Sequence, residues 1–584
     1  MARTQDQLPQ YLRKYCTEHD FDKYTARDHA SWRYIMRRAV PFFRQHSVKG
    51  YEEGLAATGI SLDRIPHIDE IDQALQKISW GAVPVCGFIP PWAFLEFQAR
   101  KILPIATDMR TVDHIAYTPA PDIVHEAAGH APILPDVDYN QYLAYYAKLG
   151  TKAIYSKQDL QLYEAVRYLS DIKEKYESTP EEIATAERRL QAAVKAFTYV
   201  SEAAKVGRMS WWTAEYGMVG SLDAPKIYGA GLLSSVGESK DAMTAKVRKL
   251  PLSLDCTNFS FNITEPQPQL FVAENMQHLH DVLHELDDTL SYRLGGQPAL
   301  IKAIESEAVT TAVLDSGIAI SGILGQSIAE DQSPVFLKYQ GPVQLSWQES
   351  EMDGQGVARH AQGYSSPLGR LKRFPNKPFT KLTLAELEEL KLRPGQRTEL
   401  EYQSGFTVQG TVTELIRKAE NLVLVTFTDC RVTRGSEVFF EPEWGEFDLI
   451  IGDLVASVYG GPADRESYGE HEIIDAQTSP GRDIPYSAEE RQLFEQYQTV
   501  RELRQSENRS LKLEKAGALA QAALEHTPQE WLLLLELLEL GQDHLGLAPQ
   551  DQAWLGALQQ HLGQPQNFRT DDQSLVKHGL SLLN

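Results

Sequence analysis

Cysteine is scarce in this sequence, and its few copies lie far apart. The 584 residues include four cysteines, none of them in a CxxC pair: Cys16, Cys86, Cys256 and Cys430. This spacing excludes a disulfide-rich secreted scaffold and a cysteine-based zinc site. The amino-terminal segment "MARTQDQLPQYLRKYC" also lacks the apolar stretch of a secretory signal. We therefore expect the protein to work in a reducing cytoplasm.

Long apolar runs are absent as well, and positive charge is in deficit. The most apolar segment, "WLLLLELLELG" at 531–541, is far shorter than the roughly 20 residues that a membrane-spanning helix needs. The 57 Lys and Arg residues face 80 Asp and Glu residues, which gives a net charge of −23. Nucleic acids and anionic membranes attract clustered cations, so we expect neither as a partner. Small molecules and other proteins remain as the expected partners.

The pattern of apolar and polar residues changes along the chain, which predicts a multidomain α+β protein. Residues 1–330 are mainly helical by apolar periodicity and are expected to form one domain. Residues 331–392 carry prolines without periodicity, which is typical of a linker. Residues 393–475 alternate apolar and polar side chains, which predicts a small antiparallel β-barrel or sandwich. Amphipathic helices return over 476–584, and this C-terminal region is a candidate for joining subunits in a homo-oligomer.

Two histidine pairs are candidates for a metal site. In "PDIVHEAAGH" (121–130), His125 and His130 are five residues apart, which is about 140° around an ideal α-helix. The zinc-peptidase pattern HExxH needs a spacing of four, so both side chains reach one metal only if the helix ends or distorts near Gly129. The rival pair, His280 and His284, has the better spacing. It lies with acidic residues on the polar side of an amphipathic helix, where we expect a solvated face.

Four segments resemble the catalytic domain of the tetrahydropterin-dependent aromatic amino acid hydroxylases, the family of phenylalanine, tyrosine and tryptophan hydroxylases. They are "TDMRTVDH" (107–114), "YTPAPDIVHEAAGHAPIL" (117–134), "WWTAEYGMVG" (211–220) and "KIYGAGLLSSVGE" (226–238). The segments occur in the family's order and with its internal spacing. The resemblance implies that residues 1–330 are a mainly helical catalytic domain with non-haem iron. The remainder of the chain has no counterpart in the resemblance.

The resemblance implies a ferrous ion held by His125, His130 and Glu215. Two imidazoles and one carboxylate on one face of Fe(II) leave positions open for dioxygen, which a closed ligand set would not. Asp122 and Ser234 are candidates for fixing the orientation of an imidazole. Asp122 also lies where a helix N-cap is expected, and the two roles are compatible.

The same resemblance implies an amino acid site around Arg110. A guanidinium suits a substrate carboxylate because two parallel N–H donors match the two oxygens. Other family positions that line the amino acid fall on Thr118, Gly231 and Ser234. Trp211 would form an aromatic wall beside the substrate ring, although a buried core tryptophan would account for it as well.

For the tetrahydropterin cofactor, the resemblance implies contacts from Phe94, Glu126 and Ile89. Phe94 falls where the family stacks an aromatic ring on the pterin. Glu126 matches a glutamate that faces the cofactor without binding iron. The surrounding sequence, "GFIPPWAF" (87–94), has two prolines where the family has a polar loop, so this part departs furthest from the family pattern.

Trp211 and Ile263 favour phenylalanine as the substrate. Tryptophan at 211 resembles the phenylalanine and tyrosine hydroxylases, and Ile263 falls where tyrosine hydroxylases carry an aspartate. An apolar pocket suits an unsubstituted ring, because a buried phenol needs a hydrogen-bond partner. The expected reaction is hydroxylation of L-phenylalanine to L-tyrosine with dioxygen, a tetrahydropterin and Fe(II).

Other readings of the same residues stay open. The substrate could be tyrosine or tryptophan, or a different ring position could be hydroxylated. A zinc hydrolase with Glu126 as general base is a second reading, which the five-residue histidine spacing disfavours. A non-catalytic binding or regulatory protein on a hydroxylase scaffold is the third. The presence of all expected metal-ligand residue types argues against that scaffold.

Overall fold

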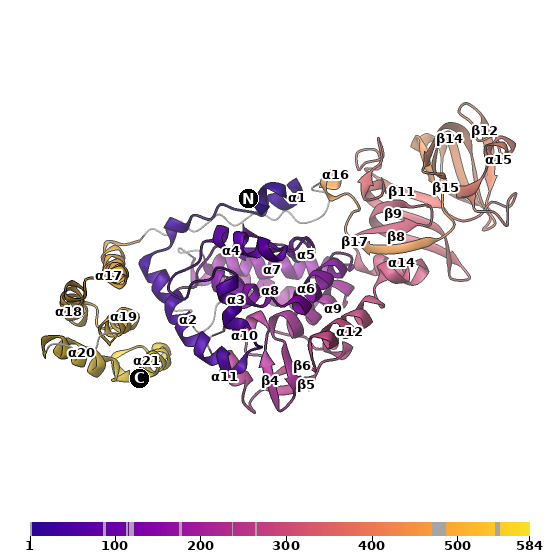
Figure 1. The fold of residues 1–584 in the computed structure, drawn as a ribbon. Coiled ribbons are helices and arrows are strands. Elements are labelled where there is room, and N and C mark those ends of the chain that lie inside the picture. The colour runs from indigo at the N-terminus through magenta and orange to yellow at the C-terminus, as the bar shows by residue number, and fades with distance from the viewer. Residues whose placement is uncertain are drawn as a thin grey trace.

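The protein combines helices and sheets in three parts that follow one another along the chain (Figure 1). A computed structural model describes residues 3–85, 89–112, 115, 122–174, 178–235, 237–262, 265–469, 486–542 and 549–583. The body (described residues up to 295) lies in the centre, the β-rich part (296–469) extends to one side, and the C-terminal helices (from 486) pack on the other. Among the described residues, no helix is long and apolar enough to cross a membrane. The mixed helix and sheet content expected from the sequence is confirmed.

The body is built mainly from helices. They are α1 Gln10–Arg13, α2 Ala26–His46, α3 Tyr51–Ala57, α4 Ile68–Leu75, α5 Pro91–Ala99, α6 Val137–Gly150, α7 Lys157–Glu174, α8 Pro180–Ala196, α9 Glu202–Ser210, α10 Ala230–Leu233, α11 Glu238–Ala242, α12 Met276–Asp287 and α13 Ser291–Leu294. In α2, Thr25 and Asp28 form a reciprocal capping box at the start. Pro41 suggests a break in this helix, yet α2 continues to His46. Burial of its apolar face, which includes Trp32, outweighs the roughly 3 kcal/mol that an internal proline costs.

Short strands anchor the segments that carry the candidate site. In the described body, β1 (Gly81–Val85) pairs in parallel with β2 (Ile102–Ala106). A four-stranded sheet has the order β4-β3-β6-β5, with β3 Met218–Ser221, β4 Ala224–Ile227, β5 Arg248–Pro251 and β6 Gln269–Ala273. Arg110 follows soon after β2, and Glu215 lies just before β3. The ends of these sheets therefore position two of the expected site residues.

The β-rich part begins before the domain boundary predicted at residue 330. Helix α14 (Gly296–Ser306) packs on a six-stranded antiparallel sheet of order β10-β9-β8-β7-β17, in which β11 also pairs with β9. The strands are β7 Val309–Leu314, β8 Ile318–Glu330, β9 Ser333–Trp347, β10 Ser350–Glu351, β11 Gly363–Pro367 and β17 Val455–Gly460. The predicted boundary thus falls inside the β8–β9 hairpin. Asp331 and Gln332 make its tight turn, with φ of 47° and 66°.

The linker expected over 331–392 is therefore wrong over its first half, where β9, β10 and β11 lie. The prolines that suggested it sit at strand ends or at an irregularity of the pairing. Pro334 is the second residue of β9, Pro367 ends β11, and Pro342 lies where the β8–β9 register shifts. Proline is tolerated at such places because no ladder hydrogen bond is lost there.

A second antiparallel sheet lies farther from the body (Figure 1). Its order is β12-β13-β14-β15, with β16 also paired to β14, and it has an apolar core of its own that includes residues near α15 (Leu384–Glu389). The strands are β12 Arg397–Glu401, β13 Phe406–Lys418, β14 Asn421–Arg434, β15 Glu437–Phe440 and β16 Phe447–Ile450. The antiparallel strands expected after residue 393 are present. The pairings among the described residues leave this sheet open, and β17 returns to the first sheet before α16 (Arg465–Tyr468).

The C-terminal helices share the hydrophobic core of the body. They are α17 Ala488–Gln505, α18 Arg509–His526, α19 Trp531–Gln542, α20 Pro549–Leu562 and α21 Thr570–Leu582. Helix α19 is buried from Trp531 to Gly541, and its leucines belong to the same apolar cluster as Trp32 and Ile35 of α2. The short apolar run with interspersed glutamates is thus the centre of this helical group.

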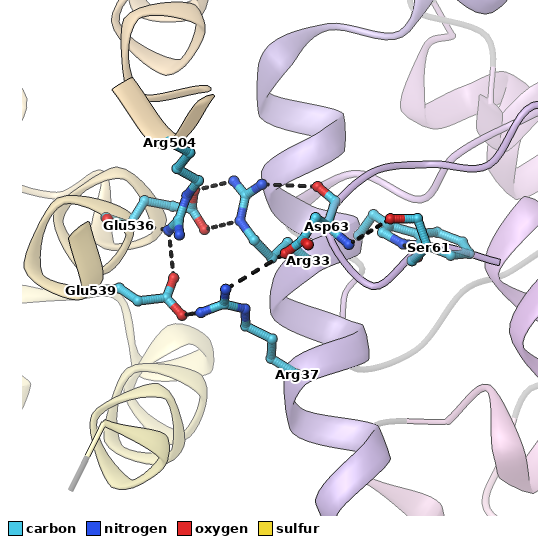
Figure 2. A network of polar contacts seen from close by, with 8 residues as sticks. Arg33, Arg37, Ser61, Asp63, Arg504, Glu536 and Glu539 are labelled. Carbon is cyan, nitrogen blue, oxygen red and sulfur yellow. Dashed lines mark hydrogen bonds and ion pairs between the residues drawn. The ribbon is translucent and has the colours of Figure 1, made fainter. Parts of the chain in front are cut away.

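An ion network joins α19 and α17 to α2 (Figure 2). Arg33 contacts both carboxylate oxygens of Glu536, with Nε donating to Oε1 at 2.8 Å. Arg504 donates to the same carboxylate at 3.2 Å, and both Arg37 and Arg504 pair with Glu539. The side chains of Arg33 and Glu536 are each only 4% exposed. Burial acts to raise the pKa of Glu536, but the arginines outweigh it and hold the pKa below its usual value.

Replacement of Glu536 by alanine should lower the free energy of unfolding by about 3–5 kcal/mol, because Arg33 would stay buried without its counter-charge. Thermal and urea unfolding followed by circular dichroism measure the change. Glu525→Ala is the matched control, since the Glu525 side chain is 76% exposed, and should change stability by less than about 0.5 kcal/mol. Equal stability of the two variants would contradict a net contribution from the network.

His29 of α2 should make stability depend on pH. Burial, together with Arg501 and Arg33, lowers the pKa of His29 to about 3, and its Nδ1 accepts the N–H of Ile65 at 3.1 Å. The unfolded state therefore binds more protons between the two pKa values. The stabilisation is complete above about pH 6.5 and falls by about 2 kcal/mol on acidification to pH 5. Urea unfolding at pH 7 and pH 5 measures this loss. His29→Gln, which keeps an acceptor, should show a smaller loss, and an identical loss would contradict the assignment.

Candidate active site

His125 and His130 lie in a widened helical turn. The segment η5 (His125–His130) is a π-helix, whose hydrogen bonds run from residue i to residue i+5. This period brings side chains five residues apart close together, and the two Nε2 atoms are 3.3 Å apart. The sequence predicted a helix that ends or distorts near Gly129. The structure shows the distortion: the whole turn is widened, and it continues into the 3-10 turn η6 (Ala131–Ile133).

Gly129 lets the backbone of α10 lie against this turn. A Cβ atom at position 129 would lie only 2.6 Å from the carbonyl oxygen of Ala230, a distance that no side chain tolerates. The close approach brings Ser234, which follows α10, beside the first histidine. The Ser234 hydroxyl is 3.1 Å from Nδ1 of His125 and donates to the Ala230 carbonyl. Ser234 therefore has the imidazole contact that the sequence predicted for it.

A second π-helical turn supplies the carboxylate. Helix α9 leads into η7 (Trp211–Glu215), and Glu215 is its last residue. The two oxygens of Glu215 lie 3.2 Å from Nε2 of His125 and 3.2 Å from Nε2 of His130. The ligand-type atoms of the three residues are all within 4.8 Å of one another. Within the described ranges this is the one such group of three His, Cys, Asp or Glu side chains.

The three side chains suit a divalent metal ion. Two imidazole lone pairs repel at 3.3 Å unless a cation or a proton lies between them. Burial acts to raise the pKa of Glu215, but His130 and His125 outweigh it and hold the pKa well below its usual range. Nδ1 of His130 is buried with no hydrogen-bond partner among the described residues, and its Nε2 faces the other two side chains. Two imidazoles and a carboxylate with open positions are the donor set of non-haem Fe(II) sites.

Arg110 and Asp122 form a buried pair. Nε and Nη2 of Arg110 donate to the two Asp122 oxygens at 2.6 and 2.8 Å, and Nη1 donates to the Ser234 carbonyl at 3.2 Å. Asp122 also accepts the backbone N–H of His125 at 3.0 Å, which is the N-cap role. The imidazole contact considered for Asp122 is not observed. Of the five guanidinium N–H donors, two have no acceptor among the described residues and could bind another carboxylate.

Trp211 is held by two rings and one hydrogen bond. Its ring stacks on Phe261 with centroids 4.2 Å apart, and the ring of Tyr216 lies at 4.8 Å. Its Nε1–H donates to Oε1 of Gln267 at 3.1 Å. A Cβ atom at Gly231 would lie 2.8 Å from the Tyr216 ring, so the close approach at this glycine is to protein. Trp211 is half-buried and shares the π-helical turn of Glu215.

Four residues around Trp211 are not among the predicted site residues: Tyr216, Glu238, Phe261 and Gln267. The Glu238 carboxylate accepts the backbone N–H of Gln267 at 2.7 Å and the Tyr216 hydroxyl at 3.3 Å. Glu238 ends the quoted segment "KIYGAGLLSSVGE", which was the available signal. Gln267 is 3% exposed, and nothing in the sequence indicates that burial.

The residues expected to contact a pterin are spread over two regions. Phe94 lies half-buried in α5, and Ile89 packs against an apolar cluster that includes Leu12. Glu126 lies in η5, with one oxygen 3.9 Å from Nε2 of His130. Burial raises the pKa of Glu126 to about 8, and its Oε2 has no hydrogen-bond partner. Of these residues, Glu126 is the one whose described interactions connect it to the histidine–glutamate group.

The remaining predicted residues are outside the described ranges or outside the site. Thr118 and Ile263 lie outside the described residues. His280 bonds to a backbone carbonyl at 3.0 Å, and the exposed His284 contacts a tyrosine hydroxyl at 3.1 Å. In the described chain neither belongs to a group of three His, Cys, Asp or Glu side chains close enough to hold a metal. Asp287 departs from the expected solvated helix face, because it is buried against neighbouring side chains.

Sequence comparison gives the family of this site. The profile of the biopterin-dependent aromatic amino acid hydroxylases matches residues 10–161 and 197–297. The matched residues, which we call the hydroxylase domain, include His125, His130 and Glu215. The match indicates a pterin-dependent aromatic amino acid monooxygenase. It ends at the start of α14, where the β-rich part begins.

Relatives of the hydroxylase domain are phenylalanine-4-hydroxylases. That of Pseudomonas aeruginosa is 26% identical over 278 residues, which cover 47% of this chain and 89% of the relative. That of Vibrio cholerae is 26% identical over 278 residues and is covered to 81%. A solved structure of Chromobacterium violaceum phenylalanine hydroxylase with bound iron(III) and oxidised cofactor 7,8-dihydrobiopterin is 23% identical, with a TM-score of 0.38. The match covers 50% of this chain and 94% of the chain in the solved structure.

Gly129→Ala should reduce metal binding by the hydroxylase domain at least about tenfold, because the new Cβ pushes α10 and Ser234 away from His125. Metal content after anaerobic reconstitution with Fe(II) measures the effect. Gly207→Ala is the matched control: Gly207 lies in α9, and a Cβ there meets no atom within 4 Å. The control should bind metal normally and gain up to about 1 kcal/mol of stability. Normal metal binding by Gly129→Ala would contradict the packing argument.

Proposed function

We propose that the protein hydroxylates L-phenylalanine to L-tyrosine with dioxygen and a tetrahydropterin, at an Fe(II) ion held by His125, His130 and Glu215. The observation that carries this proposal is the convergence of two imidazole nitrogens and one carboxylate within 4.8 Å. The group lies in the segment that matches the pterin-dependent hydroxylases. The names of the relatives, phenylalanine-4-hydroxylases, support the substrate.

The chain's own residues would bind and orient the reactants. Bound Fe(II) and tetrahydropterin would supply the electrons and the activation of dioxygen. Arg110, fixed by Asp122, would bind the substrate carboxylate with its two remaining donors. Trp211 would pack against the aromatic ring, and the burial of His130 would keep water from one side of the metal. Ser234 would hold the imidazole of His125 in orientation.

The pterin contacts are also proposed from the family resemblance and from the described contacts of these residues. Glu126 is proposed to face the cofactor, because its buried Oε2 lies in the ligand turn and has no hydrogen-bond partner among the described residues. Phe94 and Ile89 are proposed as ring and edge contacts, and Thr118 as a further contact to the amino acid. Ile263 is proposed to favour an unsubstituted ring over a phenol. Tyrosine and tryptophan are the alternative substrates. Analysis of the products formed from phenylalanine, tyrosine and tryptophan distinguishes these alternatives.

Subunit assembly through the C-terminal helices is a separate proposal. Helix α19 buries its leucines against other helices of the same chain, so its apolar surface is already occupied. An assembly would therefore use the outer faces of α18, α20 or α21. Light scattering of the full chain tests it, and a monomer at micromolar concentration would overturn it.

Glu215→Ala and His125→Ala should each lose bound iron and at least about 100-fold of tyrosine formation from phenylalanine, because two ligands hold the metal weakly. Iron analysis and product chromatography with Fe(II), oxygen and tetrahydrobiopterin measure both effects. His284→Ala is the matched control: it removes an exposed histidine and should leave both quantities unchanged. Full turnover by either ligand variant would contradict the assignment. A wild-type protein that consumes no pterin with any aromatic amino acid would favour a regulatory scaffold instead.

A further inference from the structure

The orientation of the Gln267 side chain is fixed by two backbone carbonyls. Its Nε2 donates to the carbonyl of Asn262 at 2.9 Å and to that of Glu265 at 2.8 Å. The amide nitrogen therefore faces its own loop, and the amide oxygen is left to accept the Trp211 N–H at 3.1 Å. Gln267 is 3% exposed, so water does not compete for these bonds. Any movement of the Gln267 backbone would be transmitted to the Trp211 ring.

Glu238 ties this loop to the turn that carries Glu215. One carboxylate oxygen accepts the backbone N–H of Gln267 at 2.7 Å. The other accepts the hydroxyl of Tyr216 at 3.3 Å, and Tyr216 directly follows Glu215 in the chain. Glu238 is itself held at the start of α11, where its backbone N–H donates to the Ser235 hydroxyl at 3.0 Å. The carboxylate thus connects both supports of the Trp211 ring.

Two aromatic rings contact Trp211 in addition to the Gln267 amide. Tyr216 lies 4.8 Å from the Trp211 ring, and its own ring is pressed against Gly231. Phe261 stacks on Trp211 at 4.2 Å with an interplanar angle of 9°. The described contacts of Glu238 are to Gln267, Tyr216 and Ser235, and none is to the histidine–glutamate group. Its effect on a substrate would be indirect.

We propose that Glu238 is a positioning residue, whose carboxylate holds Gln267 and Tyr216 and through them sets the plane of the Trp211 ring against the aromatic substrate. The inference rests on the proposed function, because it assigns Trp211 to the substrate wall. A wall displaced by about 1 Å contacts the ring less well in both ground state and transition state. Loss of such uniform binding raises KM and leaves kcat nearly unchanged. Glu238 is therefore expected to govern affinity for the amino acid and not the rate of hydroxylation.

Glu238→Gln tests this role in the full-length, iron-loaded protein. The amide keeps the size of the side chain, but its neutral oxygen is a weaker acceptor than a carboxylate oxygen. The bond to Tyr216 survives only if its direction reverses, with the amide donating to the hydroxyl oxygen, so both supports are weakened. We expect KM for phenylalanine to rise about five- to twentyfold, with kcat within about twofold of wild type. Titration calorimetry without pterin, under argon, should show the same rise in Kd. Asp241→Asn is the matched control: Asp241 is an exposed residue of α11 that pairs with Lys246, and the variant should change neither constant.

Tyr216→Phe is the second variant, because it removes a single hydroxyl and keeps the ring. It should raise Kd and KM in the same direction, by about two- to fivefold. If Glu238→Gln does not fold, Tyr216→Phe decides the question. A folded Glu238→Gln protein with unchanged Kd overturns the proposal, even if its melting temperature falls. Wild-type turnover together with such a result removes this inference alone, whereas the absence of wild-type turnover with any aromatic amino acid removes the proposed function and this inference with it.

Discussion

The width of one helical turn governs how this site is built. Because His125 and His130 are five residues apart, their ring nitrogens meet only where the backbone adopts the i to i+5 pattern. Such a turn is rare in isolation, so tertiary contacts must hold it. Asp122 bonds to the first N–H of the turn, and the α10 backbone lies against Gly129. A second widened turn then brings Glu215 to the histidines.

The C-terminal helices share the hydrophobic core of the body. The chain leaves the body after α13, builds the two sheets of the β-rich part, and returns to pack on α2 (Figure 1). Buried ion pairs are costly unless every charge has partners, and here Glu536 has two arginines around it (Figure 2). The glutamates that interrupt the apolar run of α19 are the groups that match Arg33 and Arg37. They specify how the helix docks.

Features that depend on residues close together in the sequence could be predicted, and contacts between distant parts of the chain could not. The spacing of His125 and His130, and the antiparallel strands after residue 393, were visible because each depends on neighbouring residues. The expected linker was wrong over its first half, because the prolines there sit at strand ends and a register shift. The contact of Arg110 with Asp122 needs the fold, since both are polar residues with several suitable partners. Arg33 and Glu536 are 503 positions apart, and nothing in the sequence around either residue identifies the other as its partner.

The same separation bears on how the protein is made. Helix α2 emerges early from a ribosome, but the carboxylate that neutralises Arg33 is 503 residues downstream. At about 5–20 residues per second, roughly 25–100 seconds pass before that partner is synthesised. During this interval the apolar face of α2 and its arginines lack their final neighbours. The packing of α2 is therefore completed only after the last helices of the chain have been synthesised.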